Sequence, residues 1–393
     1  MRQRLIPAAY ALFVVGGLLS GTLGVHHMAT FADDAQVSRL PKNSSTTDHA
    51  TPAPVVQSLP ARLLVEVSNR APQPTATPVA ENLKGSERWS LLYVLGGDLW
   101  QTTPEGPLQL THDGHIGQPA LGEGALAFVE RSRNASDIWL ASADGPPWPI
   151  TRNSVPTISE NHWAMQPAFL PGRQRLYGLG DFNKSTTGVG DLAVWELGLD
   201  LTPPVQITRP PAYAGGDQDV TIDPVDPRQI VFTRYAYAGS QLIEQLQWLD
   251  VSTDRLVPLT PPDQSSRQAT YSPDGTSLAF VQRTDGAQEN LYVAHLQLAD
   301  IGPHLEDPQH VATGVIANPV WCPDASSLIY IAMAGDRFEV WSVDVQRDAD
   351  GAETFGGPRQ MTNGPGVDAS SRPVCTTPEL ADQVRQWLTP APP

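Results

Sequence analysis

The chain has 393 residues and a net charge of −17, which suits one large domain or two smaller ones. Nucleic-acid binding leaves a basic surface, so this acidic balance argues against a nucleic-acid partner. Two cysteines exclude a four-cysteine zinc site and a scaffold with many disulfides. The 38 prolines and 32 glycines favour short strands joined by tight turns over long helices.

Residues 1–32 have the pattern of a membrane-targeting segment. Two positive charges in MRQR precede an uncharged run of 21 residues, from Leu5 to Val25. A run of this length spans a hydrocarbon core of about 30 Å as a helix, and the charges before it favour an N-in orientation. We expect a single-pass membrane anchor. A cleaved signal peptide is the alternative, with small residues for cleavage at Thr30 and Ala32. In both cases the rest of the chain is expected outside the cytoplasmic membrane.

Residues 33–87 are rich in Ser, Thr, Pro and Ala, a composition that buries too little apolar surface to fold alone. We interpret this segment as a linker that holds the following domain away from the membrane. One island, Arg62–Val67, has the pattern of a strand and is expected to dock on a partner or on an edge of the domain itself.

A repeat of about 50 residues organises the rest of the chain. An apolar segment that opens with a polar residue recurs, and its second residue falls at positions 119, 167, 220, 269, 319 and 373, at spacings of 48, 53, 49, 50 and 54. Such a period indicates a repeat architecture. The six leading segments are QPAL (118–121), QPAF (166–169), DVTI (219–222), QATY (268–271), NPVW (318–321) and RPVC (372–375).

Each unit contains three further apolar runs, bounded by Gly, Asp or Pro as β-strands are. Examples are SLAFVQ (277–282) for the second run and NLYVAH (290–295) for the third, and the fourth run ends in threonine in five of six units. Four strands per unit and six units predict an all-β fold, a six-bladed β-propeller.

The two ends of the repeat region are complementary. The first unit lacks a leading strand, because the chain enters at RWSLLYVL (88–95), and no strand follows the last leading segment. We therefore expect the C-terminal strand to complete the first blade, which leaves no free edge. Residues 88–378 are predicted to form the propeller, and 379–393 a short helix, at 379–388, with a tail.

The leading segments resemble the TolB-like propeller repeat. The likeness rests on YSPDG (271–275), WCPDA (321–325) and FLPG (169–172), whereas LGEG (121–124) and IDPVD (222–226) lack the full Ser-Pro-Asp-Gly. The family includes periplasmic translocation proteins, accessory domains of serine peptidases and membrane-anchored proteins. The resemblance therefore implies a platform that binds proteins or ligands, and no particular chemistry.

A polar residue opens every leading segment. Innermost strands line the axis of a propeller, so these six side chains are expected to form one polar ring near the mouth of the channel. As a binding site, the ring would take a peptide end, a small polar ligand or an ion. As a structural feature, it would satisfy backbone groups at the strand starts. The six residues are Gln118, Gln166, Asp219, Gln268, Asn318 and Arg372.

No catalytic, cofactor or metal-binding motif stands out in the sequence. The nine histidines are scattered, HDGH (112–115) has no third ligand nearby, and the G-x-S-x-G of hydrolases does not occur. We therefore predict a protein that is not an enzyme and carries no cofactor or metal. A hydrolase or lyase would have to begin from Asp217 and Asp219 with His115 or His162.

Cys322 and Cys375 lie on leading strands of consecutive blades, one register position apart. Because side chains alternate along a strand, the two point to opposite faces of their blades, and opposite faces meet between neighbours. A disulfide is permitted in an oxidising compartment if the Cα atoms approach within about 7 Å. Two buried thiols are the alternative.

The sequence predicts a membrane anchor, a linker and a rigid propeller without a recognisable group of catalytic residues, and this combination favours a binding function. We expect a non-catalytic scaffold or accessory subunit that binds protein partners in a membrane or envelope complex. The first alternative is a receptor for a small polar ligand or peptide in the central channel, and the second is a propeller hydrolase or lyase.

Overall fold

The structure is a computed structural model, and it describes residues 88–389 apart from 123, 173, 185–187, 189, 284–287, 300–301 and 349–351. The expected anchor, linker and strand-like island all lie outside the described residues. No helix in the described part of the chain has the length and apolar character needed to span a membrane.

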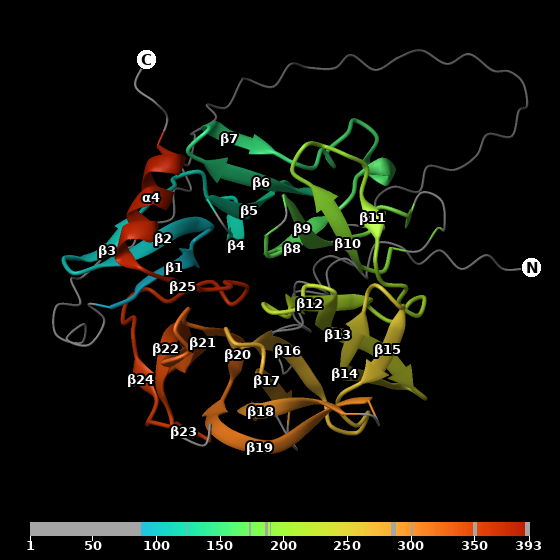
Figure 1. Ribbon diagram of the computed structural model, residues 1–393. Coiled ribbons are helices and arrows are strands. Elements are labelled where there is room, and N and C mark those ends of the chain that lie inside the picture. The colour runs from blue at the N-terminus through green and yellow to red at the C-terminus, as the bar shows by residue number, and fades with distance from the viewer. Residues whose placement is uncertain are drawn as a thin grey trace, which may run out of the picture. The chain divides into compact units, whose positions relative to one another are not determined.

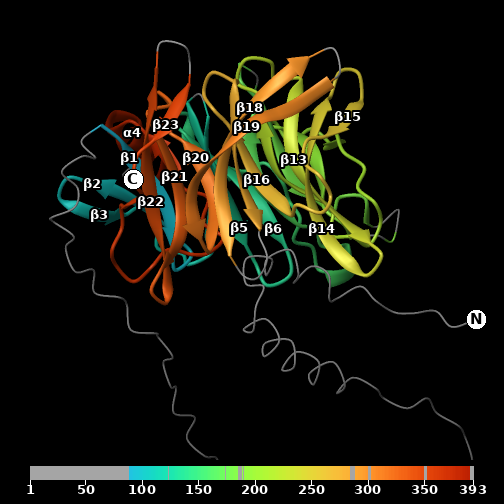
Figure 2. The ribbon, with the colours of Figure 1, turned by 90° about the horizontal axis from the view of Figure 1, so that it is seen from below.

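Six antiparallel sheets are arranged as blades around a central axis (Figure 1). Seen edge-on, the strands run from one face of the disc to the other (Figure 2). Blades 2 to 5 each have four strands in chain order, innermost first. These are β4 (Ile116–Gly122), β5 (Ala125–Arg131), β6 (Ser136–Ser142) and β7 (Gly145–Pro149) in blade 2; β8 (Ala164–Phe169), β9 (Arg175–Gly180), β10 (Ala193–Gly198) and β11 (Val205–Gln206) in blade 3; β12 (Asp217–Ile222), β13 (Gln229–Ala238), β14 (Gln241–Asp250) and β15 (Arg255–Pro258) in blade 4; and β16 (Ser266–Tyr271), β17 (Ser277–Arg283), β18 (Glu289–Ala299) and β19 (Gly302–Gly314) in blade 5.

Blade 6 departs from this plan at its outer edge. Its first three strands are β20 (Ile316–Trp321), β21 (Ser327–Ala334) and β22 (Arg337–Arg347). Two short strands, β23 (Glu353–Phe355) and β24 (Arg359–Gln360), share the fourth position and both pair with β22. Two glycines and a proline separate them, and proline has no N–H to donate to the ladder.

Blade 1 closes the ring. It combines β25 (Val374–Thr376) with β1 (Ser90–Leu95), β2 (Asp98–Thr103) and β3 (Gly106–Gln109). β25 pairs antiparallel with β1, with Cys375 opposite Leu91. The six-bladed propeller of four-stranded blades, and its closure by the C-terminal strand, are thus confirmed.

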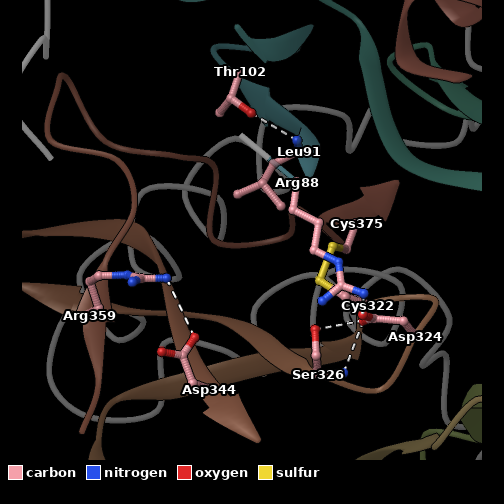
Figure 3. Close-up of a disulfide and its surroundings, with 9 residues drawn as sticks. All are labelled: Arg88, Leu91, Thr102, Cys322, Asp324, Ser326, Asp344, Arg359 and Cys375. Atoms are coloured by element: carbon pink, nitrogen blue, oxygen red, sulfur yellow. Dashed lines mark hydrogen bonds and ion pairs between the residues drawn. A yellow bond between two sulfur atoms is a disulfide. The ribbon is translucent and has the colours of Figure 1, made fainter. Parts of the chain in front are cut away.

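A disulfide joins the two blades that meet at the closure (Figure 3). Cys322, directly after β20, is bonded to Cys375 of β25, and their Cα atoms are 5.0 Å apart. Both cysteines are buried. Beside the bond, Arg88 forms an ion pair with Asp324, so the start of the described chain is also tied to blade 6.

The repeated threonine at the end of the fourth run has a structural role. In five blades its hydroxyl accepts a hydrogen bond from the backbone N–H of a residue in the third strand, at 2.9–3.1 Å. This bond ties the outermost strand to its neighbour where the ladder ends. The pairs, threonine first, are Thr111 and Leu99, Thr151 and Ile138, Thr208 and Val194, Thr260 and Leu246, and Thr362 and Val340.

The hydrophobic core is divided among the gaps between blades. One cluster between blades 1 and 2 includes Leu126 and Phe128 and is covered by α4 (Pro378–Leu388), which buries Ala381, Val384 and Trp387 against it. The hydroxyl of Thr377 caps this helix by accepting from the N–H of Leu380. The helix lies at the outer rim of the two blades (Figure 1).

Removal of the disulfide should destabilise the closed ring. The bond spans 53 residues, and a cross-link of that span stabilises a fold by about 4 kcal/mol through the entropy of the unfolded chain. We expect reductant to lower the free energy of unfolding by about this amount in urea titrations. Cys322→Ala/Cys375→Ala is the control, because its stability should not respond to reductant. Equal stability of the wild type with and without reductant would contradict the assigned role.

Thr208→Val should cost about 1–3 kcal/mol in the free energy of unfolding, because the buried N–H of Val194 loses its acceptor and the buried Asp217 carboxylate loses a hydrogen bond from the same hydroxyl. Thr313 is the matched control. Its exposed hydroxyl donates to Asn290 Oδ1 at 2.7 Å instead of accepting from a strand N–H. Thr313→Val should therefore cost less than about 1 kcal/mol in the same urea titration. Equal losses in the two variants would refute the capping role.

Candidate functional site

Five of the six polar residues proposed from the sequence are the third residue of an innermost strand, and Arg372 lies two residues before β25; we call the six the axial ring. Their end of the axis is the ring end, and the opposite end is the far end. Because the strands of a blade alternate in direction, the connections between blades and the hairpins between second and third strands also lie at the ring end.

Five of the six axial-ring residues have a left-handed backbone, with φ between 49° and 54°. Each sits at a β-bulge, where the register between the first and second strands of its blade shifts. A bulge leaves backbone groups outside the ladder. The five residues are Gln118, Gln166, Asp219, Gln268 and Asn318.

Side chains of the axial ring form hydrogen bonds with the backbone of the next blade. These bonds fall into two separate runs of two, which we call half-circuits. In the first, Gln118 Oε1 accepts from the N–H of Gln166 at 2.9 Å, and Gln166 Oε1 accepts from the N–H of Asp219 at 2.7 Å. In the second, Gln268 Oε1 accepts from the N–H of Asn318 at 3.0 Å, and Asn318 Nδ2 donates to the carbonyl of Ser371 at 2.8 Å. Each contact links one blade to the next.

The half-circuits end at two charged residues in opposite blades. Asp219 of blade 4 does not continue to Gln268, whose N–H donates to Thr233 Oγ1 at 3.0 Å. The guanidinium of Arg372, before blade 1, has only donors, so it cannot accept a hydrogen bond from the backbone N–H of Gln118. Arg372 Nη2 lies 3.7 Å from Asp219 Oδ1, which is an ion pair but not a hydrogen bond. The pair therefore spans the axis between the two gaps.

Both charges of this axial ion pair are largely removed from water. The Asp219 side chain is 4% exposed and the Arg372 side chain 22%. Burial raises the pKa of Asp219 and lowers the pKa of Arg372, in each case against the attraction of the other. The charged forms are thus less favourable here than in water, despite the pairing.

A second charged cluster surrounds Arg267, the residue just before Gln268. Its guanidinium is 2% exposed and forms ion pairs with Glu244 and Glu289, and Arg283 approaches the same two carboxylates. Burial alone would lower the pKa of Arg267, but Glu289 and Glu244 outweigh it and raise that pKa. The two arginines and two glutamates balance, so this cluster is internally neutral.

The structure does not assemble the residues named for a hydrolase or lyase. Asp217 is fully buried in a two-pronged ion pair with Arg234, with both N–O distances 2.7 Å. His162 instead contacts the side chain of Asp181, at 3.4 Å. Among the described residues, neither Asp217 nor Asp219 forms a hydrogen bond or ion pair with a histidine, and no group of three or more His, Cys, Asp or Glu is placed to hold a metal ion.

Sequence reasoning missed Arg131, at the end of β5. Its guanidinium lies over Gly117, since a Cβ on that glycine would be 3.0 Å from Nη2. Gly117 directly precedes Gln118, so Arg131 reaches the axial ring from the second strand of its blade. A glycine beside a ring position is a sequence signal for such a close approach.

Comparison with known proteins identifies the fold. No family model and no curated protein matches the chain. TolB from Acinetobacter baumannii matches with 18% identity and a TM-score of 0.53, over 73% of this chain and 66% of that one. The fold is that of a TolB-like β-propeller. The recognition made from the repeat is thus confirmed.

Two further solved structures are similar to the chain. Kuenenia stuttgartiensis hydrazine synthase matches with 11% identity and a TM-score of 0.52, over 74% of this chain and 47% of that one. A putative TolB from Agrobacterium tumefaciens has 12% identity and a TM-score of 0.46, over 74% and 98% of the two chains. The chain spans less than two thirds of the first TolB and about half of the synthase. At these identities the comparisons establish the fold and leave activity and partners to be argued from the residues.

Substitution of Arg372 tests how much the ion pair with Asp219 contributes to the stability of the fold. Arg372→Gln removes the more strongly acting of the two positive charges near the buried Asp219 carboxylate and leaves only that of Arg267, which should lower the free energy of unfolding at pH 7 by up to about 3 kcal/mol. Adding Asp219→Asn should recover part of this loss. Additive effects of the two substitutions in urea titrations would show that the charges do not interact.

The pH dependence gives an independent check of the same pair. Below the pKa of Asp219, its neutral carboxyl needs no counter-charge. Burial raises the pKa of Asp219, and loss of Arg372 raises that pKa further, so the destabilisation by Arg372→Gln should be largest at high pH and shrink as the pH falls toward about 4, the usual range of an aspartate. A loss of equal size at both pH values would count against the pairing.

Proposed function

We propose that this protein is a non-catalytic, extracytoplasmic β-propeller that binds a protein partner, as a scaffold or accessory subunit of a membrane or envelope complex. The observation that carries the proposal is a set of exposed apolar side chains at the ring end of blades 3 and 4. A membrane anchor at residues 1–32 and a linker over 33–87 are part of the same proposal.

Exposed large hydrophobic residues are unevenly distributed over the described part of the propeller. All ten fall between residues 155 and 315, in blades 3 to 5 and the connections that flank them, and none belongs to a strand of blades 1, 2 or 6. Neighbouring exposed apolar groups mark interaction surfaces and single ones do not, so the residues that share one end of these blades are the candidates. The ten are Val155, Ile158, Leu201, Val205, Tyr213, Val225, Tyr237, Leu256, Leu298 and Val315.

Three residues form the strongest candidate contact at the ring end. Ile158, Tyr213 and Tyr237 are 66%, 57% and 52% exposed, and they come from two consecutive connections between blades and from the β13–β14 hairpin. Tyrosine is enriched at protein interfaces because it offers a rigid apolar ring with a polar end. We call these three residues the apolar contact.

Tyr213 is held in an outward position by its loop. Its backbone has φ 63°, and the buried carboxylate of Asp191 accepts from the N–H groups of Tyr213 and Gly215. Gly215 packs against Tyr235, since a Cβ on that glycine would be 3.5 Å from the Cβ of Tyr235. Tyr235 lies two residues before Tyr237, so the two exposed tyrosines belong to segments that pack together. A fixed loop reduces the entropy lost on binding a partner.

Two observations support the remaining parts of the proposal. The buried disulfide is of the kind that persists in oxidising compartments, which supports a position outside the cytoplasm. The carboxylates nearest the axis, Asp217 and Asp219, are paired with Arg234 and Arg372, so they are not free to act as acids or bases. This supports a binding function over hydrolysis or elimination.

The test is co-purification of tagged, full-length protein from its native membranes in mild detergent. We expect a stoichiometric protein partner that survives size exclusion, and intact residues 1–32 by mass spectrometry. Tyr213→Asn/Tyr237→Ser should remove the partner without loss of stability. Asparagine is chosen because it tolerates the left-handed backbone at position 213.

The matched control carries the same chemistry at the far end. Val225 and Leu298 are 72% and 54% exposed, and lie in or beside the β12–β13 and β18–β19 turns. Val225→Ser/Leu298→Ser should keep the partner. Retention of the partner by the tyrosine variant, or a wild-type protein that purifies alone, would overturn the proposal.

A further inference from the structure

Arg372 has hydrogen-bonding capacity that the protein does not use. A guanidinium carries five N–H donors. Among the described residues, Arg372 forms no hydrogen bond, and its one ionic contact is Asp219 at 3.7 Å. The side chain is 22% exposed, so it is mostly buried yet still reached by solvent. The donors of Arg372 that lack a protein partner are therefore reached by solvent, and a bound anion would take them up.

Arg131 is in a similar position on the neighbouring blade. Among the described residues it forms no ion pair, and its side-chain contact is with Ser370 Oγ at 3.5 Å, the limit of a hydrogen bond. The acidic group that affects it, Asp368, already accepts from the N–H groups of Gly96 and Gly97 at 2.9 and 3.0 Å. Arg131 therefore also has unused donors.

The two arginines approach the same gap in the axial ring. Ser370, which Arg131 contacts, lies two residues before Arg372, and Arg131 itself lies over the glycine before Gln118. This is the junction of blades 1 and 2, where the ring lacks a side-chain acceptor. Burial lowers the pKa of both arginines, and an anion between them would oppose that effect.

We propose that the ring end of the axis binds a carboxylate, held by Arg131 and Arg372. A carboxylate is the anion whose planar, two-oxygen geometry matches a guanidinium fork. Arg372 already faces one carboxylate, that of Asp219, at a distance too long for a hydrogen bond. A ligand carboxylate would compete with Asp219 for Arg372 and recruit Arg131, on a surface separate from the apolar contact.

The carboxylate belongs to a small organic acid or to the C-terminus of a peptide, and two probes distinguish these sources. Isothermal titration would use succinate, and trialanine with a free or an amidated C-terminus. Binding of succinate together with the free peptide indicates general carboxylate recognition, and binding of the free peptide alone indicates a chain end. Amidated trialanine should not bind in either case.

Variants connect the binding to the two arginines. Arg131→Gln and Arg372→Lys should each weaken binding at least about tenfold, the scale of one charge-assisted hydrogen bond. Arg372→Lys keeps the positive charge opposite Asp219, so it tests the guanidinium fork and not the fold. Asp219→Asn should tighten binding by about tenfold, because the competing carboxylate is gone.

Arg359→Gln is the matched control. Arg359 lies on β24, at the outer edge of blade 6 and not on an innermost strand, and it pairs with Asp344 at 3.6 Å (Figure 3). Its binding should equal that of the wild type. Absence of binding to any probe up to about 10 mM, or equal affinity in the wild type and both arginine variants, would overturn the proposal.

Discussion

The fold depends on the pairing of β25 with β1. Six blades form a closed ring only if the first and last blades meet, and here three residues of the C-terminal strand supply the innermost position of blade 1. A strand this short forms few backbone hydrogen bonds with β1, so other contacts also hold the first and last blades together. The disulfide ties β25 to blade 6, Arg88 ties the start of the described chain to Asp324, and α4 covers the gap to blade 2. The rigidity on which both proposals rest begins at this junction.

Closure of the ring brings the axial bulges close enough to form hydrogen bonds with one another. The backbone N–H groups of three bulged residues, Gln166, Asp219 and Asn318, donate to an amide side chain of the preceding blade. The hydrogen bonds therefore run around the ring as well as along the strands. This arrangement favours the structural interpretation of the polar ring for its amide members. It leaves Asp219 and Arg372 as the members whose chemistry extends beyond backbone satisfaction.

The six-bladed architecture could be predicted from the sequence, because each repeat contains the local pattern that determines its four strands. Alternating apolar runs, turns and the complementary ends determine strand order without knowledge of distant contacts. The divided outer strand of blade 6 was not foreseen, because PRQMT (358–362) keeps the repeat pattern while its proline and the two glycines before it interrupt the ladder. The ring positions were found from the sequence, but their bulges, the cross-axis ion pair and the approach of Arg131 depend on packing between blades. A pattern read within one repeat does not contain such contacts.

Departures from a repeat are informative when the physical role of the repeated residue is known. In the contacts between bulges, a backbone N–H donates to a side-chain oxygen of the preceding blade, so a side chain that accepts is enough to continue a circuit. A carboxylate also accepts, so Asp219 could continue its circuit but does not, whereas a guanidinium only donates and Arg372 must end one. The two charged members of the axial ring fall in opposite blades, at the two places where the circuits stop. Structural demand alone is met by amides at the other four positions. The charges at 219 and 372 therefore require a further explanation, and unused donors on Arg372 and Arg131 direct it toward an anion at the axis.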